Sequence, residues 1–186
     1  MPLILPGNVG SATASTGYDV ANSVRFDDGD SAYLQKSATG GNRKTFTFST
    51  WLKRGNLTYG YATFFSSDQA TNNSFRVTFD DDDGSNDDHL MVYYYTGSHQ
   101  LKFITTREFR DVSAWYHIVI ALDTTQATEG NRFKMYINGT QETSFSTNNN
   151  PVQNSDIGFN QASTTRIGTQ ANALSNYFDG YMAEVV

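Results

Sequence analysis

The stretch Trp115-Tyr116-His117 is the first place where the residue types suggest chemistry, because an imidazole beside two aromatic rings can belong to a catalytic or a binding site. No serine is arranged with a histidine and a carboxylate as nucleophilic catalysis requires, and the chain has no cysteine. His89, His99 and His117 lack metal-ligand spacing. His117 lies in an alternating apolar run, so we expect it to be packed and hydrogen-bonded, and Trp115 to be a core aromatic residue.

An acidic run from Asp80 to Asp88 is the second candidate. It holds six carboxylates within nine residues, and so many like charges repel one another unless water or a cation neutralises them. The run does not fit the EF-hand pattern, because Phe79 and Leu90 stand where the first and last ligands would be. It indicates either a calcium site or a solvated hairpin tip, and Asp27 to Asp30 form either a second such site or a plain turn. The metal-binding candidates are Asp81, Asp83 and Asp87.

Aromatic residues beside Asn, Asp and Gln form the third candidate, because a sugar site needs exposed rings and side chains that bind hydroxyl groups. The candidate sugar-binding residues are Tyr59, Tyr61, Tyr95, His99 and Tyr177. About half of the aromatic residues on a strand face the core, and others brace neighbouring strands, so a structural role is the alternative for each of them.

The composition narrows the class of protein that positions these residues. Hydrophobic residues make up 38% of the 186 residues and charged residues 17%, while Asn, Ser, Thr, Gln and 15 glycines supply much of the polarity. This composition favours strands and turns over helices. The net charge of −6 argues against nucleic acid as a partner, because phosphates would be repelled. The opening sequence MPLILPG predicts neither a signal peptide nor a membrane span, so no membrane insertion is expected.

Apolar and polar residues alternate from Ser23 onward, which predicts an all-β fold, a two-sheet antiparallel sandwich of jelly-roll type. We expect residues 22–186 to form this domain and residues 1–21 to form an N-terminal arm or linker. Both faces of the run 115–123 are largely apolar, which predicts a central strand covered on both sides. Asn138-Gly139 predicts a two-residue turn. Strands are expected within residues 24–26, 32–36, 45–53, 62–67, 74–79, 89–95, 100–106, 115–123, 132–139 and 140–145.

Several segments, taken in order, resemble laminin-G-like domains of the concanavalin A-like lectin/glucanase superfamily. They are SVRFDDGDSAYL, FTFSTWLKR, the Trp115-x-His117 strand with its KMYING hairpin, TTRIGT and YFDGYMAEVV. The resemblance covers roughly residues 23–186 and implies a jelly roll that can bind calcium at its rim. Members usually continue past the closing strand, so we expect either that the sequence is truncated at Val186 or that something else completes this strand.

The same resemblance argues against catalysis. Glucanases of this fold place their carboxylates in a Glu-x-Asp-x-x-Glu strand, and none of the four glutamates here belongs to such a motif. We therefore expect no catalytic residue and no enzyme. The four glutamates are Glu108, Glu129, Glu142 and Glu184.

Short chains of this kind that begin with a Pro-Gly-Ser-rich arm are similar to proteins of marine tailed bacteriophages. This resemblance implies a non-enzymatic virion structural protein, such as a fibre, tail appendage or head-decoration protein, with a lectin-like domain for attachment to a surface glycan. Its expected partners are other virion proteins, bound through the arm, and a host-surface glycan. We expect assembly in the host cytoplasm, exposure on the particle surface, and a multi-copy or homo-oligomeric state. The alternatives are a free carbohydrate-binding module or lectin, and a polysaccharide-active enzyme.

Overall fold

The computed structural model describes residues 22–57, 60–70, 72–80 and 88–186. Over these residues the chain forms thirteen strands and one short 3-10 helix, η1 (Glu129–Asn131). The strands are β1 (Val24–Phe26), β2 (Leu34–Ser37), β3 (Thr45–Arg54), β4 (Ala62–Ala70), β5 (Asn73–Asp80), β6 (His89–Tyr95), β7 (His99–Glu108), β8 (Tyr116–Asp123), β9 (Phe133–Ile137), β10 (Thr140–Glu142), β11 (Phe145–Asn149), β12 (Thr164–Ile167) and β13 (Gly180–Ala183).

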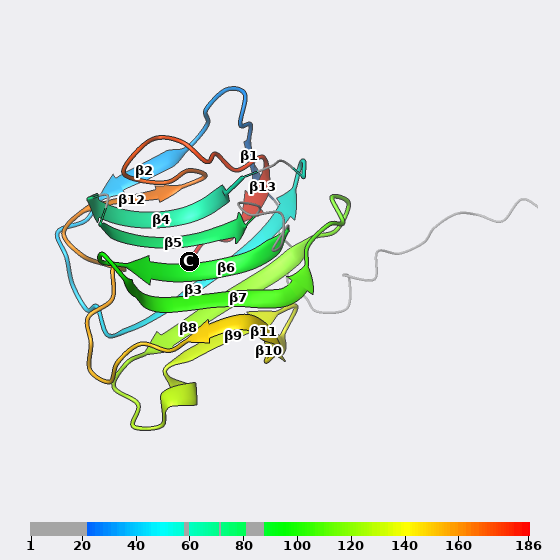
Figure 1. Ribbon diagram of the computed structural model, residues 1–186. Helices are drawn as coiled ribbons and strands as arrows, with labels where there is room; N and C mark the ends of the chain where they lie inside the picture. The colour runs from blue at the N-terminus through cyan, green and yellow to red at the C-terminus, as the bar shows by residue number, and fades with distance from the viewer. Residues whose placement is uncertain (1–21, 58–59, 71, 81–87) are drawn as a thin grey trace, which may run out of the picture.

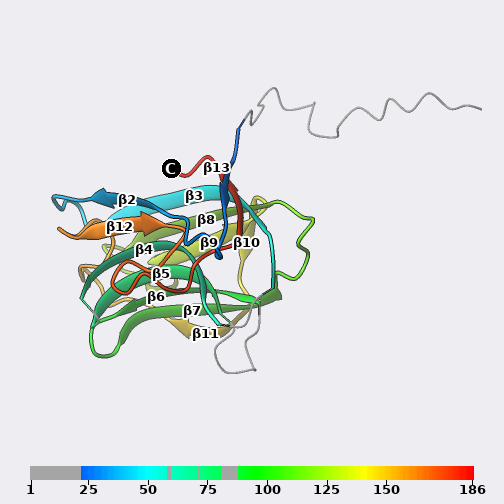
Figure 2. The ribbon, with the colours of Figure 1, turned by 90° about the horizontal axis from the view of Figure 1, so that it is seen from above.

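These strands form two antiparallel sheets that lie against each other. The six-stranded sheet has the order β1-β13-β3-β8-β9-β10, and the seven-stranded sheet has the order β11-β7-β6-β5-β4-β12-β2. Figure 1 looks onto the seven-stranded sheet with β3, β8 and β9 behind it, and Figure 2 shows the layers from above. The chain changes sheet repeatedly, for example from β1 to β2 and from β7 to β8. This arrangement confirms the all-β, jelly-roll-like sandwich.

The core lies between the sheets because alternate residues of each strand point inward. In β3, for example, Phe48 and Leu52 are buried and Ser49 is only partly so. Rings from the two sheets meet directly: Phe103 of β7 stacks on Phe133 of β9 with 4.0 Å between ring centroids. Burying one such ring stabilises the fold by about 1.5–3 kcal/mol, so this aromatic core holds the layers together.

The turn at Asn138-Gly139 is also confirmed. Both residues have positive φ angles, 51° and 79°, and they connect β9 to β10 as a tight hairpin. Glycine adopts this conformation without strain and asparagine tolerates it, which is why the pair is such a strong turn signal.

The prediction that both faces of β8 are covered was wrong. Ile118, Ile120 and Leu122 are buried in the core, but the opposite face of β8 is only half-buried, because no described element packs over the outer face of the six-stranded sheet. Trp115 is likewise not a core residue: it is 39% exposed and its ring lies 6.4 Å from that of Tyr181.

The outcome for His117 agrees with the expectation. Its ring stacks on Trp51 at a centroid distance of 4.8 Å, and its Nε2 lies 3.0 Å from the hydroxyl of Ser49. His117 is thus packed and hydrogen-bonded, although on the outer face of the six-stranded sheet.

The C-terminal end of the chain is held against β3 by backbone hydrogen bonds. Val186 exchanges two hydrogen bonds of 3.0 Å with Ser49, so the last described residue lies beside β3.

None of the helical turns in the described part of the chain is long and apolar enough to span a membrane.

Candidate functional site

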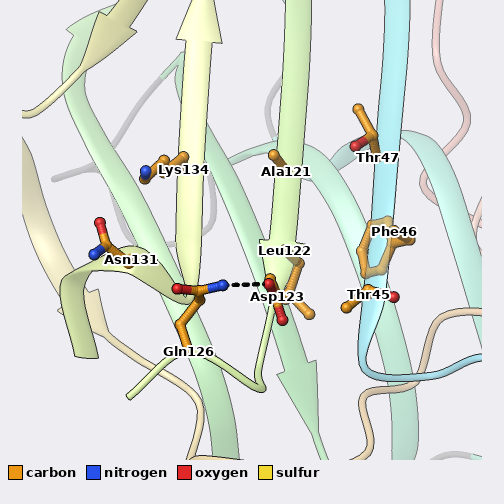
Figure 3. A pocket seen from close by; sticks show the side chains of 9 residues that line it. All are labelled: Thr45, Phe46, Thr47, Ala121, Leu122, Asp123, Gln126, Asn131 and Lys134. Atoms are coloured by element: carbon orange, nitrogen blue, oxygen red, sulfur yellow. Dashed lines mark hydrogen bonds between the residues drawn. The ribbon is translucent and has the colours of Figure 1, made fainter. Parts of the chain in front are cut away.

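Two hollows open on the outer faces of the sandwich. The first lies on the six-stranded sheet, between β3, β8, β9 and the connection that follows β8 (Figure 3). Its carboxylate, Asp123, accepts hydrogen bonds from Thr125 and from the Gln126 amide at 2.6 Å, and these bonds hold its pKa below the usual range. The ring of Phe46 packs on Phe75 and Phe159. The Asp123 carboxylate already accepts hydrogen bonds from its neighbours, and the Phe46 ring packs on core rings. This hollow is therefore a poor sugar site.

The second hollow lies on the outer face of the seven-stranded sheet and has a volume of about 500 Å³. We call it the sheet-face pocket. It exists because β5, β6 and β7 send Phe75, Val92 and Leu101 inward and the alternate residues outward. Its lining residues are Tyr61, Ser74, Arg76, Met91, Tyr93, Tyr95, His99, Lys102, Gln170, Asn172 and Ala173.

Three rings stand together in this pocket. His99 lies edge-on to both tyrosines, with its ring centroid 5.9 Å from that of Tyr93 and 5.1 Å from that of Tyr95. The tyrosines are half-buried and His99 is exposed. Tyrosine and histidine combine an apolar body with a polar tip. This is the combination that suits a ligand with both C–H surfaces and hydroxyl groups.

Arg76 organises the pocket floor. Its guanidinium lies 5.7 Å from the ring centroid of Tyr93, and its Nη1 donates to Gln170 Oε1 at 2.8 Å. Its Nη2 donates to Asn172 Oδ1 at 3.0 Å and to Ser74 Oγ at 3.4 Å. Burial raises the pKa of Tyr93 to about 12, so this phenol stays protonated and can donate a hydrogen bond at neutral pH.

Asp68 of β4 completes the support from beneath. Its Oδ2 accepts from Arg76 Nε at 3.3 Å and from the backbone N–H groups of Ala171 and Asn172 at 3.0 and 3.2 Å. Burial raises the pKa of Asp68, because the loss of hydration outweighs the nearby Arg76 charge and the N–H donors. Asp68 and Arg76 thereby fasten residues 168–176, here called the wall loop, to the sheet, where Gln170 and Asn172 form one side of the pocket.

The amide of Asn172 is oriented by this arrangement. Its Oδ1 accepts from Arg76, which leaves its NH₂ group as the other polar end of an exposed residue that lines the pocket. The pocket therefore offers rings and an amide held by Arg76, while no Asp or Glu is found among its described lining residues.

The predicted sugar-binding residues are divided by the structure. Tyr61, Tyr95 and His99 line the sheet-face pocket together. Tyr177 does not line it; this residue is half-buried and forms a bridge to Thr63 of β4. Tyr59 lies outside the described residues.

Several contributors were not among the predicted residues, including Asp68, Arg76, Tyr93, Lys102, Gln170 and Asn172. The alternation of β5 already placed Arg76 away from the core, and an outward arginine between two core residues was the available signal. Nothing in the sequence connects the wall loop to β4, because Asp68 and Asn172 are 104 residues apart.

The metal prediction falls largely outside the described part of the chain. Asp81, Asp83 and Asp87 are not among the described residues, and the described ones contain no group of three His, Cys, Asp or Glu that could hold an ion. The second candidate, Asp27 to Asp30, forms a turn, in which Asp27 accepts a hydrogen bond from Gly29 N at 3.0 Å and pairs with Arg25.

Known structures with a similar fold include both glycan-binding modules and laminin domains. Domain 4 of AbnA, an arabinanase from Geobacillus stearothermophilus solved with arabinotriose, aligns with a TM-score of 0.54 and 15% identity over 82% of this chain and 64% of that one. The LG1-3 region of the laminin alpha2 chain aligns with a TM-score of 0.61 and 12% identity, over 88% of this chain and 30% of that one.

A third similar structure is CBM40, a module of the Ruminococcus gnavus IT-sialidase, solved with alpha2,3 sialyllactose. It aligns with a TM-score of 0.52 and 9% identity, over 82% of this chain and 90% of that one. At these identities the likeness extends to the fold alone. No curated protein matches the chain in sequence.

The family follows from a match over most of the chain. Residues 27–186 fit the Laminin_G_3 model, described as the concanavalin A-like lectin/glucanases superfamily. This matched range contains every strand from β2 to β13, and hence the whole seven-stranded sheet, the six-stranded sheet except its edge strand β1, and the sheet-face pocket. The chain is therefore a member of the Laminin_G_3 family of concanavalin A-like lectin/glucanase domains.

Proposed function

We propose that this domain binds a glycan in the sheet-face pocket and does so without catalysis. The observation that carries the proposal is the group formed by Tyr93, Tyr95 and His99, held in a pocket with polar walls. Pockets that bind small ligands combine ring surfaces with a few oriented polar groups. The amide of Asn172, which Arg76 holds by a hydrogen bond to its Oδ1, is such a group here.

The non-catalytic part of the proposal is supported by the carboxylates. Glycoside hydrolysis needs two carboxyl groups that reach the scissile bond. Among the described residues, Asp68 is the carboxylate that contacts this pocket's support, and its side chain has no exposed surface. The similar structures that are named as binding modules agree with this proposal.

A glycan array followed by calorimetric titration tests binding. The matched pair of variants is Tyr95→Ala in the pocket and Trp115→Ala on the opposite sheet, since both remove an aromatic ring that is partly exposed. Tyr95→Ala should weaken binding about fivefold or more, the cost typical of truncating a central contact residue, and Trp115→Ala should leave it unchanged. Equal losses in both variants, or an array without any bound glycan, would refute the proposal.

The biological setting is a separate proposal. We propose a virion component, exposed on the particle, whose residues 1–21 dock on other virion proteins and whose multiple copies attach to a host-surface glycan. Its support is the Asn-, Ser- and Thr-rich composition and the Pro-, Gly- and Ser-containing start of the sequence. Many copies would allow weak individual sites to act together. Mass spectrometry of purified particles should detect the chain in stoichiometric amounts, and its absence from particles would exclude this role.

A further inference from the structure

We propose that the glycan recognised by the sheet-face pocket carries a negative charge, a uronate carboxylate or a sulfate, and that Lys102 receives it. This inference rests on the proposed function, because it specifies the ligand class of the same pocket. Its basis is the distribution of charge between Lys102, Arg76 and Asp68.

Lys102 faces the pocket from β7. In the strand register it stands opposite Tyr93 of β6 on one side and Asn149 of β11 on the other, and it lines the pocket with Tyr93, Tyr95 and His99. Its ammonium forms no ion pair with the described residues, whose seven salt bridges all involve arginines. Lys102 is half-buried, lies beside three rings and has no acidic partner among the described residues. It is therefore placed to pair with an acidic group of a ligand.

The other cation of the pocket, Arg76, already has partners within the protein. Arg76 donates to Asp68, Gln170, Ser74 and Asn172, and 12% of its side chain is exposed. Asp68 neutralises Arg76 from beneath, and its own side chain is fully shielded from the pocket. The pair holds the wall loop and adds little net charge, so the charge that reaches a ligand is that of Lys102.

The positive charge of Lys102 also bears on His99, which lines the same pocket. The pKa of His99 is lowered, first because this exposed residue still loses part of its hydration in the pocket, and then by the positive charge of Lys102. His99 therefore stays neutral at pH 7, and its ring remains a surface for stacking while Lys102 supplies the cation. An anionic ligand has particular need of such a cation here, because the whole chain carries a net charge of −6 and repels anions at longer range.

The test uses an array of acidic oligosaccharides, each printed beside its own neutral form. Oligogalacturonides and oligoglucuronides are printed beside their carboxyl-reduced products, and sulfated galactans beside their desulfated products. The first comparison tests recognition of a carboxylate, and the second tests recognition of a sulfate. The full chain, Lys102→Met and Lys102→Arg are compared with Lys134→Met, which alters a lysine of the hollow on the opposite sheet. Dissociation constants are then measured at low and at physiological salt.

We expect at least one acidic oligosaccharide to bind more tightly than its neutral form, and Lys102→Met to weaken that binding by about five- to tenfold. Lys102→Arg and Lys134→Met should retain it, and added salt should weaken it. If neutral and acidic forms bind equally, or if Lys102→Met leaves the preference intact, this inference fails and the proposed glycan binding stands. If no oligosaccharide binds, both fail. Thermal melting of each variant checks that a loss of binding is not a loss of fold.

Discussion

Oδ2 of Asp68 lies 3.3 Å from Nε of Arg76, and this pair connects the middle of the seven-stranded sheet to the wall loop. Asp68 accepts hydrogen bonds from the backbone of the wall loop, and Arg76 donates hydrogen bonds to its side chains. Both sets of contacts therefore depend on one buried ion pair. The wall of the sheet-face pocket therefore depends on Asp68, a residue whose side chain has no exposed surface for a ligand to contact.

The first prediction concerns the cost of breaking this pair. Asp68→Ala leaves Arg76 without its partner and two backbone N–H groups without an acceptor, so the free energy of unfolding should fall by about 3 kcal/mol. Asp156→Ala is the control, because the Asp156 side chain is 55% exposed and its Oδ2 lies 3.9 Å from Nη1 of Arg43. This substitution should lower the free energy of unfolding by less than about 0.5 kcal/mol. Urea denaturation at pH 7 measures both. Equal small effects would show that the ion pair does not hold the loop.

The titration of His99 gives the second prediction. Partial loss of hydration and the charge of Lys102 place its pKa below 6.5 in the folded state, so its contribution to the free energy of unfolding is present above pH 6.5 and is lost as the pH falls through the folded pKa. Lys102→Met should raise this pKa towards 6.5, and Lys134→Met should not change it. NMR titration of the imidazole signals measures the value directly. An unchanged pKa in Lys102→Met would place the ammonium away from the ring.

A glycine in the core supplies the third prediction. A Cβ atom at Gly158 would lie 2.6 Å from the ring of Tyr94 and 2.9 Å from Cβ of Phe75. Gly158→Ala should therefore destabilise the domain by about 1–3 kcal/mol through overpacking. Gly130→Ala is the matched control, because nothing lies within 4 Å of the added carbon, and its midpoint of thermal unfolding should stay the same or rise. A neutral Gly158→Ala would contradict the packing described for this part of the core.

The fourth prediction separates His117 from function. His117→Ala removes the stack on Trp51 and the contact with Ser49, so the protein should lose about 1 kcal/mol of stability. Glycan affinity should not change, because His117 lies on the six-stranded sheet and the pocket on the other. Loss of binding in a variant that melts normally would return His117 to the candidate site.

Most strands could be predicted from the sequence because alternation is a local signal. The runs 24–26 and 89–95 coincide with β1 and β6, and most of the others differ at their ends by a few residues. Alternation also tells which residues share a face, but not which face is covered. That is why Trp115 was predicted to be in the core: an apolar residue in an apolar run reads the same whether or not a further layer packs on it.

The site was only partly predictable for the same reason. Tyr95 and His99 belong to adjacent strands joined by a short turn, so their proximity follows from the hairpin. The contacts of Arg76 with Gln170 and Asn172 span 94 and 96 residues, and depend on a loop whose path no local pattern fixes. The rings of the pocket were thus within reach of sequence reasoning, and its wall was not.

The most direct test of the account is a two-dimensional NMR titration of the full chain with an oligosaccharide that binds on the array. The account predicts that the largest shift changes fall on Tyr93, Tyr95, His99 and Asn172, with residues of β8 and β9 unaffected. Changes centred on Trp115 and Tyr181, or on the hollow beside Asp123, would contradict it, because the sugar would then occupy the opposite face of the sandwich.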